Sequence, residues 1–170
     1  MSGEVETANE AFSQNDVGQL IGYSRIGYKG GYGYTATVWN ADGTAVNIGG
    51  GPSDSYLFTF GYGINNVGQA VGNTVDIVSR NTFATLWDNG TTFNLNDLVS
   101  NSILGNWYLE IATGINDNGW IVGEMYNRNG GESVTFLLTP DAPSAVPLPA
   151  AVWLFGSALG GFGLMRRRKA

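Results

Sequence analysis

Short alternating patterns of apolar and polar residues run through the first 140 positions. The segments 19–23 and 35–39 alternate in this way, as strands with one buried face do. Trp39 and Trp87 close two such segments and are expected to point inward. Tight turns separate the segments, since Asn and Asp cap turns with their side chains and Gly adopts positive φ freely. The pattern predicts many short strands and a fold of the all-β class.

A motif of 11 residues occurs three times in this region. The copies occupy positions 12–22, 62–72 and 113–123. Their central glycines, Gly18, Gly68 and Gly119, follow one another at intervals of 50 and 51 residues. A regular interval of this length is typical of a domain built from repeated supersecondary units.

A second motif follows the first in every copy. Residues 36–43 match residues 84–90 and, more loosely, residues 135–139. The sequence of each repeat therefore predicts, in this order, a strand, an Asn-rich turn, a second strand, a loop, a third strand, a turn and a short fourth strand. The first repeat is expected to lack its leading strand. Together the motifs predict an antiparallel β domain over residues 1–138, made of three repeats of about 50 residues.

The repeats resemble the HAF family of extracellular repeats. In that family an Ile-Asn-x-x-Gly-Gln-x-Val-Gly turn precedes a His-Ala-Phe-x-Trp strand, and the match spans most of residues 12–140. The histidine is absent from every copy here, and only the third copy keeps the phenylalanine, at Phe136. Units of four short strands predict a β-propeller-like arrangement, which would be partial because propellers usually have four to eight blades. A three-fold trefoil-like or prism-like closure is the open alternative.

The composition changes at residue 139. Four prolines fall within residues 139–149, which predicts a stiff, extended linker. The 20 residues from 146 to 165 carry no charge, enough for one helix to cross a hydrocarbon core of about 30 Å. Residues 150–170 are therefore expected to form a transmembrane helix and a basic tail. An ordinary tail anchor and a buried core helix are the alternatives, and the cations at the end disfavour the core helix.

Four consecutive cations end the uncharged segment and predict its orientation. They are Arg166, Arg167, Arg168 and Lys169. Positive residues beside a membrane span stay on the cytoplasmic side, so these four would act as a membrane stop. The β domain would then face the non-cytoplasmic side.

The tail resembles the VPLPA variant of the PEP-CTERM sorting domain. The motif residues are Val146, Pro147, Leu148, Pro149 and Ala150. The resemblance implies an exported protein of Gram-negative bacteria, held in the inner membrane in transit. It also implies an exosortase-type processing enzyme as partner and delivery to the cell surface or the extracellular space, often beside exopolysaccharide. Residues 1–10 are acidic and polar, so we expect an apolar leader upstream of them.

The composition also excludes several kinds of chemistry. The chain has no Cys and no His, which removes thiol nucleophiles, imidazole bases and the usual zinc ligands. Residues 1–141 hold all 14 acidic residues and only four basic ones, which disfavours nucleic acid as a partner. The turns at Asp16 and Asp117 offer too few carboxylates for a calcium site. A glycosidase would need a pair of carboxylates, but no spacing singles out two of the candidates, which are Asp54, Asp76, Asp88, Glu110, Glu124 and Glu132. We expect no catalytic, cofactor or metal site.

One segment suggests a ligand. Residues 27–34 are rich in Gly and Tyr, which alternate over 31–34, and Tyr28, Tyr32 and Tyr34 on a glycine-rich loop would suit stacking on sugar rings. A plain insertion loop between repeats explains the same residues.

The sequence thus predicts an exported, membrane-sorted β-repeat protein that is not an enzyme. Its expected role is structural or adhesive, at the cell surface or in the extracellular matrix. A secreted carbohydrate-binding or carbohydrate-active domain is the alternative from another class. The sequence does not specify a ligand, the cleavage position or the oligomeric state.

Overall fold

The computed structural model describes residues 9–28, 31–49 and 57–140 of the 170-residue chain. The chain divides into two compact units, Met1–Pro140 and Asp141–Ala170. The sorting motif, the membrane stop and the expected transmembrane helix fall beyond residue 140, outside the described residues. Within the described ranges, no helix is both long enough and apolar enough to cross a membrane.

The described part is an all-β structure of three antiparallel sheets, which confirms the expected fold class. Sheet 1 contains β1 (Asn9–Gln14), β2 (Leu20–Tyr28), β3 (Gly31–Trp39) and β4 (Ala45–Asn47). Sheet 2 contains β5 (Leu57–Ile64), β6 (Ala70–Asp76), β7 (Asn81–Asp88) and β8 (Thr91–Asn94). Sheet 3 contains β9 (Trp107–Ile115), β10 (Ile121–Asn127) and β11 (Ser133–Leu138).

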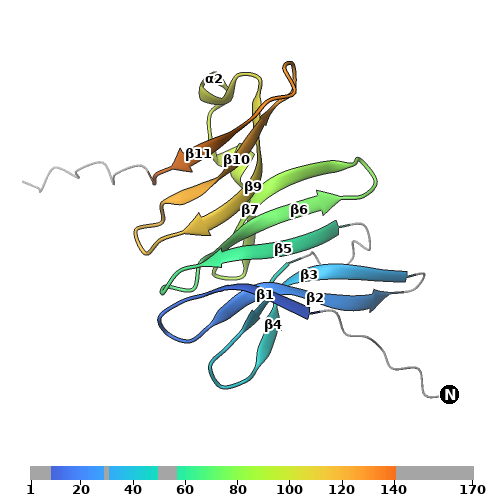
Figure 1. The fold of residues 1–170 in the computed structure, drawn as a ribbon, viewed down its shortest axis with the longest axis vertical. Helices are drawn as coiled ribbons and strands as arrows, with labels where there is room; N and C mark the ends of the chain where they lie inside the picture. The colour runs from blue at the N-terminus through green and yellow to red at the C-terminus, as the bar shows by residue number, and fades with distance from the viewer. Residues whose placement is uncertain (1–8, 29–30, 50–56, 141–170) are drawn as a thin grey trace, which may run out of the picture. The chain divides into compact units, whose positions relative to one another are not determined.

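The sheets follow one another in the order of the chain (Figure 1). Within each sheet the strands are also neighbours in chain order, and none of the three closes into a barrel in the described part. The first strand of each later sheet makes the contact with the sheet before it: β5 packs on β1, β2 and β3, and β9 packs on β5, β6 and β7. Each sheet carries one copy of the Asn-rich turn, between its first and second strands.

Two hydrophobic clusters lie between successive sheets. The cluster between sheets 1 and 2 consists of Ile21, Ala36, Val38, Ile64, Ala70 and Trp87. The cluster between sheets 2 and 3 consists of Val71, Ala84, Leu95, Leu104, Leu109, Ala112, Ile121 and Phe136. Trp87 is buried as expected, while Trp39 is only half-buried. Where two sheets follow one another, their facing apolar sides therefore cover each other, and this stacking holds the repeats together.

A glycine in the second strand of each sheet lies beside a bulge. Gly22, Gly72 and Gly123 each occur where the pairing with the first strand shifts register. A Cβ at any of these positions would overlap a carbonyl oxygen of that first strand. Only Gly permits so close a backbone approach. This explains why every copy of the motif ends in glycine.

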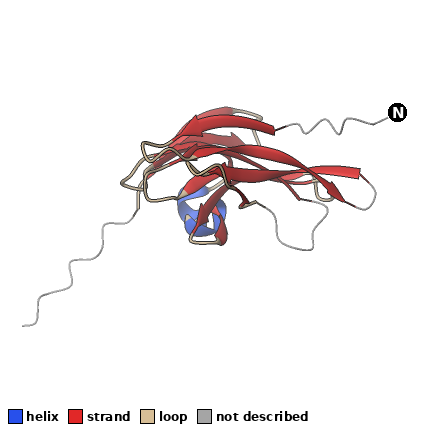
Figure 2. Cartoon of the chain, turned by 90° about the horizontal axis from the view of Figure 1, so that it is seen from below, coloured by secondary structure: helices blue, strands red, loops and turns tan. Residues whose placement is uncertain are grey.

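Two one-turn helices, α1 (Leu95–Leu98) and α2 (Asn101–Leu104), connect sheets 2 and 3 and lie on one side of the strands (Figure 2). Asn94 caps α1 by accepting a hydrogen bond from the amide of Asn96 at 3.0 Å. The Asn96 side chain accepts from the Leu109 amide at 2.8 Å and donates to the Leu109 carbonyl oxygen at 2.9 Å. Asn96 therefore bonds to β9 as a neighbouring strand would. The sequence patterns did not predict these helices.

Two expectations about local structure are wrong. The first repeat does have a leading strand, because β1 occupies that place and pairs with β2. Residues 27–34 do not form a loop between repeats, because their described positions belong to β2 and β3 of one hairpin within sheet 1. The alternation of Gly and Tyr has the period of a strand, which places Tyr32 and Tyr34 on one face.

Candidate functional site

The three Asn-rich turns share one hydrogen-bonding pattern. In each, the main-chain amide of the Asn donates to the carbonyl oxygen four residues later, at 3.0 to 3.1 Å. The Asn side-chain oxygen accepts the main-chain amide of that same residue, at 2.8 to 3.0 Å. The turn glycines Gly18, Gly68 and Gly119 have φ values of 83°, 87° and 74°, as expected. The hydrogen bonds require Asn at the start of the turn, and the positive φ requires Gly within it. Together these two requirements fix the spacing of Asn and Gly in the motif.

The asparagines also connect each turn to the next. Asn15 donates from its side-chain nitrogen to the carbonyl oxygen of Asn65 at 2.9 Å, and Asn65 donates to that of Asn116 at 3.1 Å. These three residues form what we term the asparagine ladder. Asn15 and Asn65 are buried, where a satisfied hydrogen bond contributes about 0.5–1.5 kcal/mol and an unsatisfied amide costs more. The ladder therefore ties together turns that are 50 and 51 residues apart.

A second row of hydrogen bonds runs along the exposed side of the ladder. The Asp16 amide donates to the Asn66 side chain, and the Asn66 amide to the Asp117 side chain, both at 2.8 Å. The side-chain nitrogen of Asn66 also donates to both carboxylates, at 3.1 and 2.8 Å. Asn66 thus separates the two acids. These bonds support a structural role for the turns over a calcium site.

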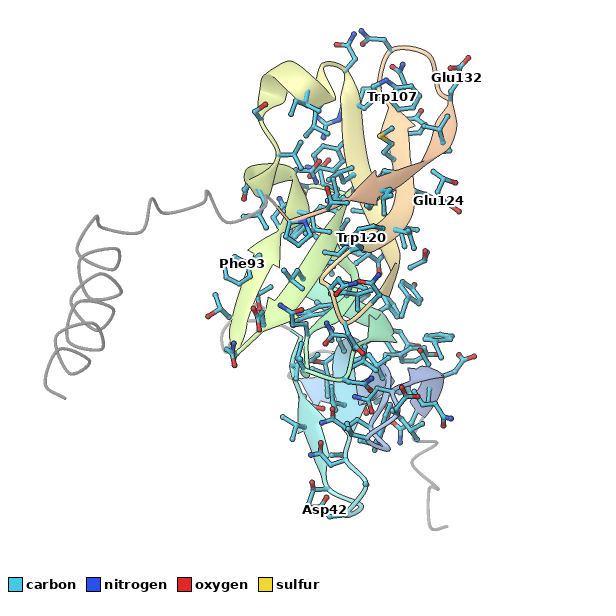
Figure 3. The ribbon with its side chains drawn as sticks, turned by 90° about the vertical axis from the view of Figure 1, so that its left-hand side faces the viewer. Asp42, Phe93, Trp107, Trp120, Glu124 and Glu132 are labelled. Carbon is cyan, nitrogen blue, oxygen red and sulfur yellow. The ribbon has the colours of Figure 1, made fainter. Side chains whose placement is uncertain are left out.

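The third turn differs from the first two in one side chain. Gln19 and Gln69 accept from Asn15 and Asn65 at 2.8 Å. Trp120 takes the place of this glutamine in the third copy and is 47% exposed; Figure 3 labels it just before β10. No described residue accepts a hydrogen bond from the side-chain nitrogen of Asn116. The side-chain nitrogens of Asn15 and Asn65 therefore both have acceptors, whereas that of Asn116, at the open end of the ladder, has none among the described residues.

An aromatic cluster lies where sheets 1 and 2 meet. It consists of Phe12, Tyr23, Tyr34, Phe58, Phe60 and Tyr62. The ring centroids of neighbouring members are 5.2 to 5.9 Å apart, mostly in edge-to-face or tilted arrangements. Phe12 at one end is 45% exposed, and the other five are half-buried. The cluster is a joint between repeats with an accessible aromatic edge.

The structure gives different surroundings to two of the three tyrosines expected to bind a ligand, Tyr32 and Tyr34. Tyr34 belongs to the aromatic cluster, where its ring packs against Tyr23 and Phe60. Tyr32 is 56% exposed and lies beneath the Arg25 guanidinium, at 3.5 Å from ring centroid to Cζ. The side chain of Tyr28 lies outside the described residues. The sequence interpretation overlooked the other five members of the cluster, although their strand-like spacing at positions 58, 60 and 62 was visible.

Two tyrosine hydroxyls of the cluster titrate above their ordinary range. The Tyr23 hydroxyl donates to the Glu10 carboxylate at 2.9 Å, and this bond is the main reason that the pKa of Tyr23 is raised. Burial, with a smaller effect of the Glu10 charge, raises the pKa of Tyr62. Both phenols therefore stay protonated at neutral pH and can donate hydrogen bonds.

Three of the candidate carboxylates have a plain structural place: Asp76 caps a turn, and Glu124 and Glu132 are exposed at the surface. The Asp76 side chain accepts from the hydroxyl and amide of Ser79 at 2.7 and 3.2 Å, and these bonds lower its pKa. Bonds from Thr44 lower the pKa of Asp42 in the same way. Glu124 and Glu132 point away from sheet 3 (Figure 3). Asp54 lies outside the described residues.

In the part of the chain that the structure describes, two carboxylates come together at Asn66, which donates to both Asp16 and Asp117. No group of three or more Asp and Glu side chains there is arranged to hold a metal ion. No protein-family model, curated protein or solved structure matches this chain.

Proposed function

We propose that this chain is an exported protein of the cell surface or extracellular matrix, with a structural or adhesive role. The observation that carries the proposal is the order of features in the tail: a Pro-containing motif at 146–150, an uncharged segment to residue 165 and four cations at 166–169. In this proposal the motif is recognised by an exosortase-type processing enzyme, the segment spans the inner membrane, and the cations stay cytoplasmic.

The β domain has features that support a structural role. Its repeats are joined by two apolar clusters and by hydrogen bonds between successive turns. The side-chain nitrogen of Asn66 donates to the carboxylates of both Asp16 and Asp117, which belong to the other two repeats. These residues hold the scaffold together, which suits a protein whose task is to persist outside the cell.

We further propose that the domain is a partial, β-propeller-like array rather than a three-fold trefoil or prism. The sheets pack in chain order, and β5 and β9 each contact the sheet before their own. A propeller blade is a sheet of four strands in chain order, as sheets 1 and 2 are. Sheet 3 has its first three strands in the same order.

Processing of the tail tests the main proposal. The double variant Pro147→Ala/Pro149→Ala changes the motif, and Pro143→Ala changes a proline of the same linker outside it. In a host that carries an exosortase-type enzyme, the unchanged chain and the Pro143→Ala variant are expected at the surface, with an intact mass reduced by loss of the tail. The double variant is expected to stay uncut in the inner membrane. An uncut, unchanged chain in the cytoplasm would overturn the proposal.

A carbohydrate-binding role is the second candidate, and the aromatic cluster favours it. Aromatic rings stack on the apolar faces of sugars, and Phe12 and Tyr32 expose rings beside the half-buried cluster members. Tyr32→Ala is expected to lower retention on exopolysaccharide in affinity electrophoresis by roughly five- to tenfold, about 1 kcal/mol. Tyr126→Ala is the matched control, because Tyr126 is exposed on sheet 3. Equal retention of the two variants would exclude binding at Tyr32.

A further inference from the structure

Sheets 1 and 3 each have one face that no described residue covers, although the equivalent face of another sheet is covered by a neighbouring repeat. Ile21 of sheet 1 and Val71 of sheet 2 are equivalent in the repeat and fully buried, because the next sheet packs on them. Their equivalent in sheet 3, Val122, is 40% exposed. Leu137 pairs with Val122 on the same face and is 56% exposed, whereas its equivalent Val38 is buried. We term this side of sheet 3, with Val122 and Leu137, the outgoing face.

On sheet 1, no described residue covers the opposite side. Ala70 of sheet 2 and Ile121 of sheet 3 are buried against the preceding sheet. Their equivalent in sheet 1, Leu20, is 38% exposed. Gln14 is exposed in the same way, although its equivalent Ile64 is buried. We term this side of sheet 1, with Gln14 and Leu20, the incoming face.

The asparagine ladder and the second row of hydrogen bonds both end at these two faces. At the third turn, the Asn116 side-chain nitrogen and the Asp117 amide have no acceptor among the described residues. At the first turn, the Asp16 side chain receives no main-chain amide, although Asn66 and Asp117 each receive one. Donors therefore end on the outgoing face, and acceptors end on the incoming face.

We propose that the β domain associates head to tail, with the outgoing face of one copy packed on the incoming face of a second copy. The chain itself indicates the partner. The faces of sheets 1 and 2 that are equivalent to the outgoing face are both covered by the next repeat, with its apolar residues and its turn. The incoming face of a second copy supplies both the apolar residues and the turn. The turn at Asn116 and Asp117 then continues its bonds onto Asn15 and Asp16 of that copy. Such an interface is heterologous and forms either a ring or an open chain.

The charges at this junction give the association a characteristic salt dependence. Inside the chain, Asn66 separates the carboxylates of Asp16 and Asp117. Between copies, Asp117 would meet Asp16 with no asparagine between them. Salt screens exposed like charges, so the association strengthens as the salt concentration rises. An association that weakens with salt would contradict this junction.

Matched variants test the interface in the full chain, kept in a mild non-ionic detergent. Val122→Asp places a charge on the outgoing face, and Val78→Asp places the same charge on a 69% exposed valine in the turn after β6. The expected result in sedimentation velocity is that Val122→Asp raises the dissociation constant about tenfold or more, while Val78→Asp leaves it nearly unchanged. Circular dichroism of each variant checks that the fold is retained.

Mixing two variants tests whether the association is head to tail. Leu20→Asp damages the incoming face, and Val122→Asp damages the outgoing face of another copy. Each variant alone is expected to associate only weakly, but an equimolar mixture has one intact pair of faces and forms a 1:1 complex. A monomer at every concentration, equal effects of Val78→Asp and Val122→Asp, or a mixture that stays monomeric would each overturn the proposal. None of these outcomes bears on sorting of the tail.

Discussion

Asn65 offers the most direct test of how the repeats are held together. It is 3% exposed, and its side chain makes three hydrogen bonds: to the amide and side chain of Gln69, and to the carbonyl oxygen of Asn116. Asn65→Ala removes all three. At about 0.5–1.5 kcal/mol each, their loss lowers the free energy of unfolding by about 2–4 kcal/mol.

Asn116 provides the matched comparison at the open end of the ladder. Its exposed side chain accepts two local amide bonds, at 3.0 Å each, and makes no bond to a described residue of another repeat. Asn116→Ala is therefore expected to lower the free energy of unfolding by about 1 kcal/mol. The isosteric Asn65→Asp keeps the acceptor for the Gln69 amide but loses both donated bonds and adds a buried negative charge, so it is expected to lower the free energy of unfolding at least as much as Asn65→Ala.

Urea unfolding followed by tryptophan fluorescence measures these differences. Trp87 is buried between sheets 1 and 2 and reports on loss of that interface. With a slope of about 2 kcal/mol per molar urea, Asn65→Ala is expected to lower the midpoint by about 1–2 M, and Asn116→Ala by about 0.5 M. If the two variants had equal midpoints, the ladder would not be what couples the repeats.

Two further predictions concern single positions. Gly72→Ala is expected to destabilise the fold by about 3 kcal/mol or more, since its Cβ would overlap a carbonyl oxygen of β5, whereas Gly27→Ala in open space changes the melting temperature little. The bonds from Ser79 hold the pKa of Asp76 below its ordinary value of 3.8, so the ionised side chain stabilises the fold above that pH and this contribution is lost as the pH falls through the lowered pKa. Asp76→Asn should therefore show a smaller acid-induced fall in melting temperature, and a carboxyl NMR titration of Asp76 at or above 3.8 would contradict this reasoning.

The head-to-tail proposal and the acidic surface of the domain bear on each other. Residues 1–141 carry 14 acidic and four basic residues, so copies repel one another at low salt. Association at the outgoing and incoming faces must exceed this repulsion, and it does so more easily at high salt or at high local concentration. Copies gathered on one cell surface would meet the second condition.

The local features of this protein are determined by its sequence. The spacing of Asn and Gly fixes the geometry of each turn, because a side-chain oxygen and a positive φ are both needed within a few residues. Alternation of apolar and polar residues gives the strands, and the all-β class follows from it. The period of about 50 residues gives the number of repeats. The prediction of a sorting tail also depends on sequence alone.

The tertiary structure decides what equivalent residues do. Val71 and Val122 occupy the same place in the repeat, yet one is fully buried and the other 40% exposed, because among the three described sheets only Val71 has a further sheet packed against it. Asn15 and Asn116 begin the same turn, but only the first donates to a turn 50 residues away. Local sequence cannot distinguish such residues, because burial and partners are set by segments distant in the chain. The aromatic cluster and the two open faces exist for the same reason.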